Sequence, residues 1–318
     1  GHFANDRSLS DADRETLLAW LDAGAPEGDP GMAIAPRSWT PGWELGEPDA
    51  TLSLPEPFPI PAEGIVEYQY TYVPTDFGED KWIEAMEIRP TDLSVVHHVL
   101  VFVEEPGAEE QQGGIDGYMG IWVPGFQGSV FPERAAKLLP AGSTLKFQIH
   151  YTPNGEPGLD QTTIGFHFAD GVPERVVETT SAYNSRFRIP AGAPNHLVEA
   201  EYEFTSPGEL LSLLPHMHLR GKAFRYDLVY PDGREIPLLD VPRYDFNWQL
   251  EYEFAEPIQV EAGTLLKAVA WFDNSADNEF NPDPTAEVGF GEQTSEEMMI
   301  GYFDWIPESS GMTAAGGG

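Results

Sequence analysis

The chain has 318 residues, 41% of them hydrophobic and 12% aromatic, a composition that excludes a disordered chain and allows two cores of ordinary domain size. Its formal net charge of -36 argues against nucleic acid or an anionic membrane surface as partner, and no apolar run approaches the ~20 residues of a membrane span. Cysteine is absent, which excludes disulfides and thiolate metal sites, so any metal must be held by His, Met or carboxylates.

The first expected element is a helix within residues 8–30, SLSDADRETLLAWLDAGAPEGDP. Ser10 is a suitable N-cap with Asp13 three residues later, Gly24 offers a C-terminal stop, and Pro26 prevents continuation. Leu17, Trp20 and Leu21 form an apolar stripe on this helix. The stripe must pack either on the following domain or on an upstream partner.

After a Pro-rich stretch from Pro36 to Pro61, short Val, Ile, Tyr and Phe runs separated by Pro and Gly predict antiparallel β-sandwiches. Residues 106–133 are expected to be irregular, and YPDGRE at 230–235 is a good hairpin turn. The expected strands lie in the runs 64–73, 81–88, 95–105, 144–152, 163–169, 196–204, 210–221, 224–239, 248–254, 265–272 and 298–306.

The two halves resemble one another. PAGSTLKFQIHY from Pro140 parallels EAGTLLKAVAWF from Glu261, the pair His97–His98 precedes His216 and His218 by a similar interval, and TIGFHF parallels AEVGFG. Chance similarity of short strand-and-turn patterns is the alternative to duplication. We therefore predict an all-β chain with two tandem antiparallel jelly-roll-like β-sandwich domains after one short N-terminal helix. The expected boundaries are 1–35 for helix and linker, 36–178 and 179–310 for the sandwiches, and 311–318 for a flexible tail.

The histidines of these runs can bind metal. Residues i and i+2 of a strand share a face, roughly 6.6 Å apart, so His216 and His218 can converge on one ion while Met217 points away. The adjacent His97 and His98 point to opposite faces of a regular strand, so joint ligation requires a strand end, a bulge or a ring that folds back.

A third imidazole is available to only one pair. His150 follows the Ala-Gly turn of the first half, whereas the matching residue of the second half is Trp271, so a third ligand there must come from elsewhere. We interpret His2 and His196 as solvated, and His167 as a strand residue and a reserve ligand.

Three imidazoles suit zinc or copper, whereas a thioether ligand favours Cu(I). Met298 and Met299 are the candidates, and core packing is the alternative role for both.

Five motifs resemble the copper type II, ascorbate-dependent monooxygenases, the family of peptidylglycine α-hydroxylating monooxygenase and dopamine β-monooxygenase. They are VVHHVLVF, FQIHYTPNG, LPHMHLRGK, DNSADNEFNPDP and EQTSEEMMIGYF, and the resemblance covers about residues 50–306. It implies two jelly-roll-like sandwiches, each holding one copper on facing surfaces of an open cleft.

The resemblance also implies roles for individual residues. The first copper would transfer electrons, and the second would activate O₂ for hydroxylation of a substrate C–H bond. Gln148 and Tyr302 match positions near the coppers and the cleft. The ligands carried over are His97, His98 and His150 for the first copper, and His216, His218 and Met298 for the second.

The implied partners are a small-molecule or peptide-like substrate, O₂ and a reductant, either ascorbate or a cytochrome domain. Peptide-amidating members have an arginine where Leu214 stands here, which argues against a C-terminal glycine substrate. The N-terminal segment resembles the last helix of a bacterial c-type cytochrome domain, although the chain has no Cys-x-x-Cys-His haem motif. We expect an extracellular or periplasmic location.

Two alternatives remain open. The same fold could be a non-catalytic copper-binding module for electron transfer, sensing or extracellular structure. A zinc hydrolase would need a carboxylate general base beside His97, His98 and His150, and the neighbouring sequence offers none.

Overall fold

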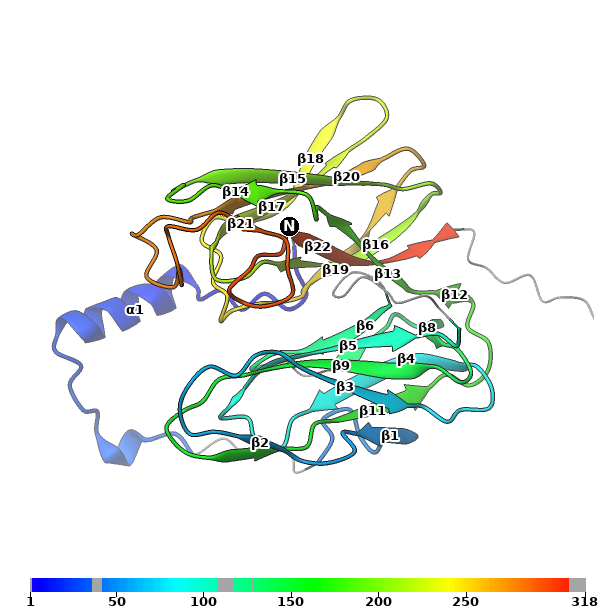
Figure 1. Ribbon diagram of the computed structural model, residues 1–318, viewed down its shortest axis with the longest axis horizontal. Helices are drawn as coiled ribbons and strands as arrows, with labels where there is room; N and C mark the ends of the chain where they lie inside the picture. Colours follow the sequence, from blue (N-terminus) through cyan, green and yellow to red (C-terminus); the bar gives the residue numbers. More distant parts are fainter. Residues whose placement is uncertain (1, 36–41, 108–116, 127, 309–318) are drawn as a thin grey trace, which may run out of the picture.

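The computed structural model describes residues 2–35, 42–107, 117–126 and 128–308, and these residues form two β-sandwiches that pack against each other (Figure 1). The predicted all-β class with one short N-terminal helix is confirmed. The predicted tail 311–318 lies outside the described residues. Among the described residues, no helix combines the length and the hydropathy needed to cross a membrane.

The first sandwich has two main sheets and a short ribbon. The outer sheet contains, in spatial order, β1 (Ala50–Ser53), β11 (Thr163–Phe168), β4 (Lys81–Arg89), β8 (Ala135–Leu139) and β12 (Arg175–Val176), with β7 (Ser129–Val130) paired to β4. The inner sheet contains β3 (Gln69–Pro74), β9 (Thr144–Tyr151), β5 (Val96–Glu104) and β6 (Tyr118–Trp122). The ribbon contains β2 (Phe58–Ile60) and β10 (Gly158–Asp160).

The second sandwich is built in the same way. The inner sheet contains β13 (Glu178–Tyr183), β22 (Ile300–Pro307), β16 (Gly208–His216) and β19 (Tyr252–Val260). The outer sheet contains β15 (His196–Glu203), β20 (Leu265–Phe272), β17 (Gly221–Val229) and β18 (Glu235–Val241). The ribbon contains β14 (Arg188–Ile189) and β21 (Val288–Gly289). The expected border at 178 and 179 lies at the start of β13.

The strand orders agree between the sandwiches, as two copies of one fold require. The order β1–β11–β4–β8 matches β13–β22–β16–β19, and β3–β9–β5–β6 matches β15–β20–β17–β18. The equivalent strands β9 and β20 also share one alternation of buried and half-buried residues, which agrees with the sequence match of PAGSTLKFQIHY and EAGTLLKAVAWF.

Two of the sequence correspondences are wrong. TIGFHF forms β11, whose equivalent is β22, whereas AEVGFG contains β21. His97 is the second residue of β5, whereas His216 ends β16, the equivalent of β4. The two histidine pairs therefore flank the same connection of the fold from its opposite ends, because similar spacing in sequence does not fix the strand on which a residue lies.

The segment 106–133 differs from the expected irregular structure, since it contains β6 and β7. The strand β6 was not predicted because the surrounding sequence is rich in Gly, and β6 is stabilised by its pairing with β5. Three further strands differ in their bounds by several residues, because β3 begins only at Gln69, β16 ends at His216, and β19 begins at Tyr252 and runs on to Val260.

A shared apolar cluster joins the two sandwiches. The inner sheets of the two sandwiches face each other (Figure 1). The cluster residues lie on β5 and β6 of one inner sheet and on β16 and β22 of the other, together with two residues just outside these strands, Val123 and Met298. Separate cores fill each sandwich. The buried members of this interface cluster are Leu100, Phe102, Ile121, Val123, Leu214, Met298, Ile300 and Tyr302.

The helix α1 (Asp11–Asp22) forms as predicted, with Ser10 accepting a hydrogen bond from the backbone N–H of Asp13. A short 3₁₀ turn, η1 (Pro30–Met32), follows it. The helix projects from the sandwiches (Figure 1) and has no buried residue. Its apolar stripe therefore does not pack on the following domain, which was one of the two expected arrangements.

Candidate metal centre

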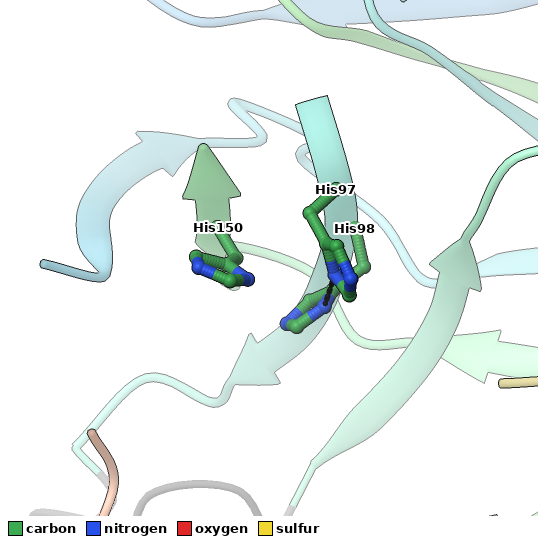
Figure 2. A group of neighbouring side chains, drawn as sticks. All are labelled: His97, His98 and His150. Atoms are coloured by element: carbon green, nitrogen blue, oxygen red, sulfur yellow. Dashed lines mark hydrogen bonds between the residues drawn. The ribbon is translucent and has the colours of Figure 1, made fainter. Parts of the chain in front are cut away.

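The first histidine group combines residues from two neighbouring strands. One ligand atom from each of His97, His98 and His150 lies within 4.8 Å of the others (Figure 2). Val96 pairs with Tyr151 and His98 with His150, so His97 is the extra residue of a β-bulge. The bulge lets two adjacent histidines reach one site, as the sequence argument requires. Among the described residues, no carboxylate belongs to this group.

The second group lies where β16 ends. His216 is the last residue of the strand, His218 lies just beyond it, and their ring centroids are 5.3 Å apart. Met217 points into the second core, so the alternation of side chains continues past the strand end. The buried Glu297 carboxylate fixes this turn, because it accepts hydrogen bonds from the backbone N–H groups of His218 at 2.9 Å and Arg220 at 2.6 Å.

Hydrogen bonds fix which ring nitrogen of the second group is free. Gln249 donates its side-chain amide to the carbonyl of Phe246, so its Oε1 faces His216 Nδ1 at 2.7 Å and accepts from it. His218 Nδ1 lies 3.3 Å from the carbonyl oxygen of Glu296 and donates to it. In both rings the lone pair is therefore on Nε2, in the arrangement by which proteins orient histidine ligands.

The first group is oriented from the opposite sandwich. Asn247 donates its amide N–H to Asp245, so its Oδ1 accepts from His97 Nε2 at 3.0 Å. The lone pair of His97 is then on Nδ1, 3.0 Å from His98 Nδ1, which donates to it. His98 Nε2 keeps a lone pair that has no donor.

Buried polar atoms without a partner gather at this place. Buried side-chain nitrogen and oxygen atoms almost always have a hydrogen-bond partner in folded proteins. Of the eight such unpaired atoms in the described part of the chain, four lie around the two histidine groups. They are Tyr68 Oη, His98 Nε2, His150 Nδ1 and His218 Nε2. The unpaired ring nitrogens of His98 and His150 belong to the first histidine group and that of His218 to the second, and unpaired imidazole nitrogens in a buried region fit metal binding.

Burial keeps these rings neutral. Loss of solvation lowers the pKa of His98 and His218 well below the ordinary range. The same cause lowers the pKa of His150 to about 3 and that of His216 to about 4. Metal ligation requires the neutral imidazole, so the rings are in the competent form at neutral pH.

Met298 lies two residues before β22, the strand that pairs with β16. His216, the last residue of β16, pairs with Ile300, the first residue of β22, in the antiparallel ladder. Met298 belongs to the interface cluster, whereas Met299 belongs to the second core. Of the two candidates, only Met298 lies on the side of the interface.

Two aromatic rings separate the histidine groups. The Tyr68 centroid lies 5.0 Å from His150, 5.5 Å from His98 and 6.1 Å from His218. Phe246 stacks on His97 at 4.7 Å and lies 6.1 Å from both His98 and His218. The facing surfaces are thus in contact, and the open cleft that the resemblance implies is not the arrangement found here, because these rings fill the space.

Gln148 and Tyr302 lie beside the centre. Gln148 donates to the hydroxyl of Tyr70 at 3.1 Å, and that hydroxyl donates to Glu292 of the second sandwich at 2.5 Å. Tyr302 is buried in the interface cluster, 6.4 Å from the ring of His216 and 4.8 Å from the ring of Tyr118. Neither residue belongs to the three-histidine group.

The remaining histidines lie elsewhere. His167 is on β11 of the outer sheet and is not part of the three-histidine group. His196 begins β15 and is half-buried, which differs from the solvated turn residue expected from Pro194. His2 is exposed, as predicted.

Sequence reasoning missed the segment 244–249, which lies outside the strands and contacts both histidine groups. Phe246 and Asn247 reach His97, Gln249 orients His216, and the Tyr244 hydroxyl donates to the carbonyl of Met217 at 2.7 Å. No local pattern marks these residues, because their role depends on the contact between a loop of the second sandwich and the first sandwich.

A surface groove of about 720 Å³ adjoins the centre. Phe246 and Asn247 form part of its wall, and the exposed Trp248 and Phe280 offer apolar surface. Its charged lining residues are Lys222, Arg243, Asp245, Asp273, Asp277 and Glu279.

No protein-family model matches the chain, and no curated protein matches it. The solved structures similar to it include the major capsid protein of bacteriophage PM2, with 12% identity, a TM-score of 0.35, and coverage of 83% of this chain and 99% of that one. Another is yeast allantoicase (Saccharomyces cerevisiae), with 8% identity, a TM-score of 0.22, and coverage of 79% and 80%. These likenesses are too weak to bear on function.

Proposed function

We propose that the chain is a dicopper monooxygenase that hydroxylates a substrate C–H bond with O₂ and an external reductant. The observation that carries this proposal is the set of five neutral histidines in two adjacent groups, with Met298 buried in the apolar cluster of the interface. A thioether favours copper over zinc, and the first group contains no carboxylate that could act as the general base of a zinc hydrolase.

The side chains of the chain hold and orient the metals. His97, His98 and His150 would bind the first copper, and His216, His218 and Met298 the second. Bound copper would supply one-electron chemistry and the activation of O₂. Tyr68 and Phe246 lie between the groups, and their rings would lie along the path of an electron that passes from one metal to the other.

The groove beside Phe246 and Asn247 is the place we assign to substrate. Leu214 is buried in the interface cluster and carries no charge, which supports the exclusion of a peptide carboxylate at that position. The substrate would be a small molecule or a peptide-like compound without that anchor. Ascorbate or a cytochrome domain would be the reductant, outside the cell or in the periplasm.

Metal analysis and oxygen uptake test the proposal together. We expect two coppers per chain after reconstitution, and O₂ consumption with ascorbate that rises with a hydroxylated substrate from a broad panel. Free copper at the same concentration and a chain with His216→Ala and His218→Ala are the controls. Stoichiometric zinc in freshly isolated protein, or the failure to bind copper, would contradict it.

A non-catalytic copper module is the second candidate, and the burial of the second group favours it. His216 is 3% exposed and His218 is fully buried, which suits electron transfer or sensing. In that case the chain would hold two coppers and cycle between oxidation states, yet would consume no more O₂ than free copper with every substrate of the panel.

A further inference from the structure

Tyr68 lies between the two histidine groups and has a buried hydroxyl. The side chain precedes β3 of the first sandwich and is 6% exposed. Its hydroxyl is buried and has no hydrogen-bond partner in the described part of the chain. Its backbone is fixed across the interface, because its N–H donates to Gln293 of the second sandwich at 3.2 Å. The position of this hydroxyl is therefore determined by both sandwiches.

Residues of both sandwiches surround the Tyr68 side chain. The ring is edge-on to His98 and His150 of the first group, and to His218 of the second group at 6.1 Å. Besides burial, nearby Tyr244, Tyr70 and Glu297 raise the pKa of Tyr68, and Tyr244 and Glu297 belong to the second sandwich. Tyr244 bonds to Met217 and Glu297 bonds to His218, so the turn that carries His218 forms one wall of the space around Tyr68.

We propose that the Tyr68 hydroxyl donates a hydrogen bond to a small anionic ligand bound at the second metal. The ligand class is that of azide and hydroxide, which accept hydrogen bonds and bind copper directly. This inference rests on the copper binding proposed above. The buried Nε2 of His218, which has no hydrogen-bond partner in the described part of the chain, would be the metal-ligating atom of the same region. In this low-dielectric space a hydrogen bond to an anion is stronger than in water.

The role differs from that of the metal ligands. Tyr68 offers a neutral O–H donor, whereas the imidazoles offer lone pairs. Phe246 also lies between the histidine groups, but its apolar ring cannot donate a hydrogen bond to a ligand of the metal. Tyr68 would thus decide which ligand is retained at the second metal and would not itself hold the metal.

Azide titration of the copper-loaded full chain tests the proposal. The variant Tyr68→Phe keeps the ring and removes only the hydroxyl, and Tyr72→Phe at an exposed position on β3 is the matched control. We expect Tyr68→Phe to retain two coppers and to bind azide about tenfold more weakly, since hydrogen bonds to charged groups are the stronger class. Tyr72→Phe should bind azide as the unaltered chain does.

Carbon monoxide provides an internal comparison because it accepts hydrogen bonds poorly. Its affinity for the Cu(I) form should change by less than about twofold in Tyr68→Phe. Unchanged azide affinity with both coppers present would overturn the role of Tyr68 alone. Loss of copper from Tyr68→Phe would also overturn it, by showing that the hydroxyl holds the site. An unaltered chain that takes up no copper would overturn the proposed function as well.

Discussion

Hydrogen bonds at single residues prepare the histidines for metal binding. Gln249 and Glu296 leave the lone pairs of the second group on Nε2, and Asn247 leaves that of His97 on Nδ1. Because the amides of Asn247 and Gln249 are themselves fixed by other bonds, each tautomer follows from donor and acceptor chemistry. The three unpaired imidazole nitrogens then point to metal more strongly than the H-x-H spacing does.

Substitution of Met298 tests whether its thioether sulfur is a ligand of the second copper. Met298→Leu should reduce the copper content from two per chain to one and abolish O₂-dependent hydroxylation, because leucine fills the space without a thioether. Copper analysis and product formation measure both effects. Met299→Leu, in the second core, is the control and should keep both coppers at a cost of less than about 1.5 kcal/mol in stability. Full activity of Met298→Leu would contradict the assignment.

The segment 244–249 is an element without regular structure that serves both histidine groups. It leaves the second sandwich between β18 and β19 and reaches His97 of the first. Asn247 of this segment contacts the first histidine group and Gln249 contacts the second, so the two sites can be weakened separately by substitution.

Asn247→Ala and Gln249→Ala form a reciprocal pair of variants. Asn247→Ala should lower the copper affinity of the first site, and Gln249→Ala that of the second, each by about 10–100-fold, because each removes the partner that orients a ligand. Chelator competition, followed separately for the two coppers by their spectra, is the measurement. Equal loss at both sites in either variant would show that the segment acts only as a general support.

The helix α1 adds little to the stability of the sandwiches. Leu17, Trp20 and Leu21 are 46–56% exposed, so they bury little apolar surface in the folded chain. Leu17→Ser with Leu21→Ser should change the free energy of unfolding by about 0.5 kcal/mol or less, as measured by thermal or denaturant unfolding. A loss of several kcal/mol would show that this stripe packs on the body of the protein.

At the scale of the whole molecule, the interface places five histidines in a buried region. The cost of that burial is visible in their lowered pKa values. Without metal the folded chain must keep these rings neutral, whereas the unfolded chain can protonate them at the ordinary pKa of ~6.5.

The metal-free protein should therefore lose stability in acid. The unfolded state binds more protons than the folded state once the pH falls below ~6.5, and the loss continues until the pH reaches the lowered folded values. For His216 that value is about 4. Denaturant unfolding should show a decrease of roughly 2 kcal/mol or more between pH ~6.5 and ~4, with copper opposing it. Unchanged stability across this window would contradict the burial of neutral rings.

The sequence by itself determined the class of the fold, the N-terminal helix and the residues that could bind metal. Strand alternation, capping and turn chemistry are local, and a search for imidazole and thioether ligands needs only residue types. The internal match of PAGSTLKFQIHY and EAGTLLKAVAWF also indicated duplication, because equivalent strands carry similar alternation.

Only the tertiary structure decided how these residues meet. It set the histidine pairs on different strands of the repeated fold, separated Met298 from Met299, and revealed β6 within a Gly-rich stretch. It also brought Tyr68 and the segment 244–249 between the groups. These features depend on strand register and on the contact between two sandwiches, and both arise from pairings between residues far apart in the chain.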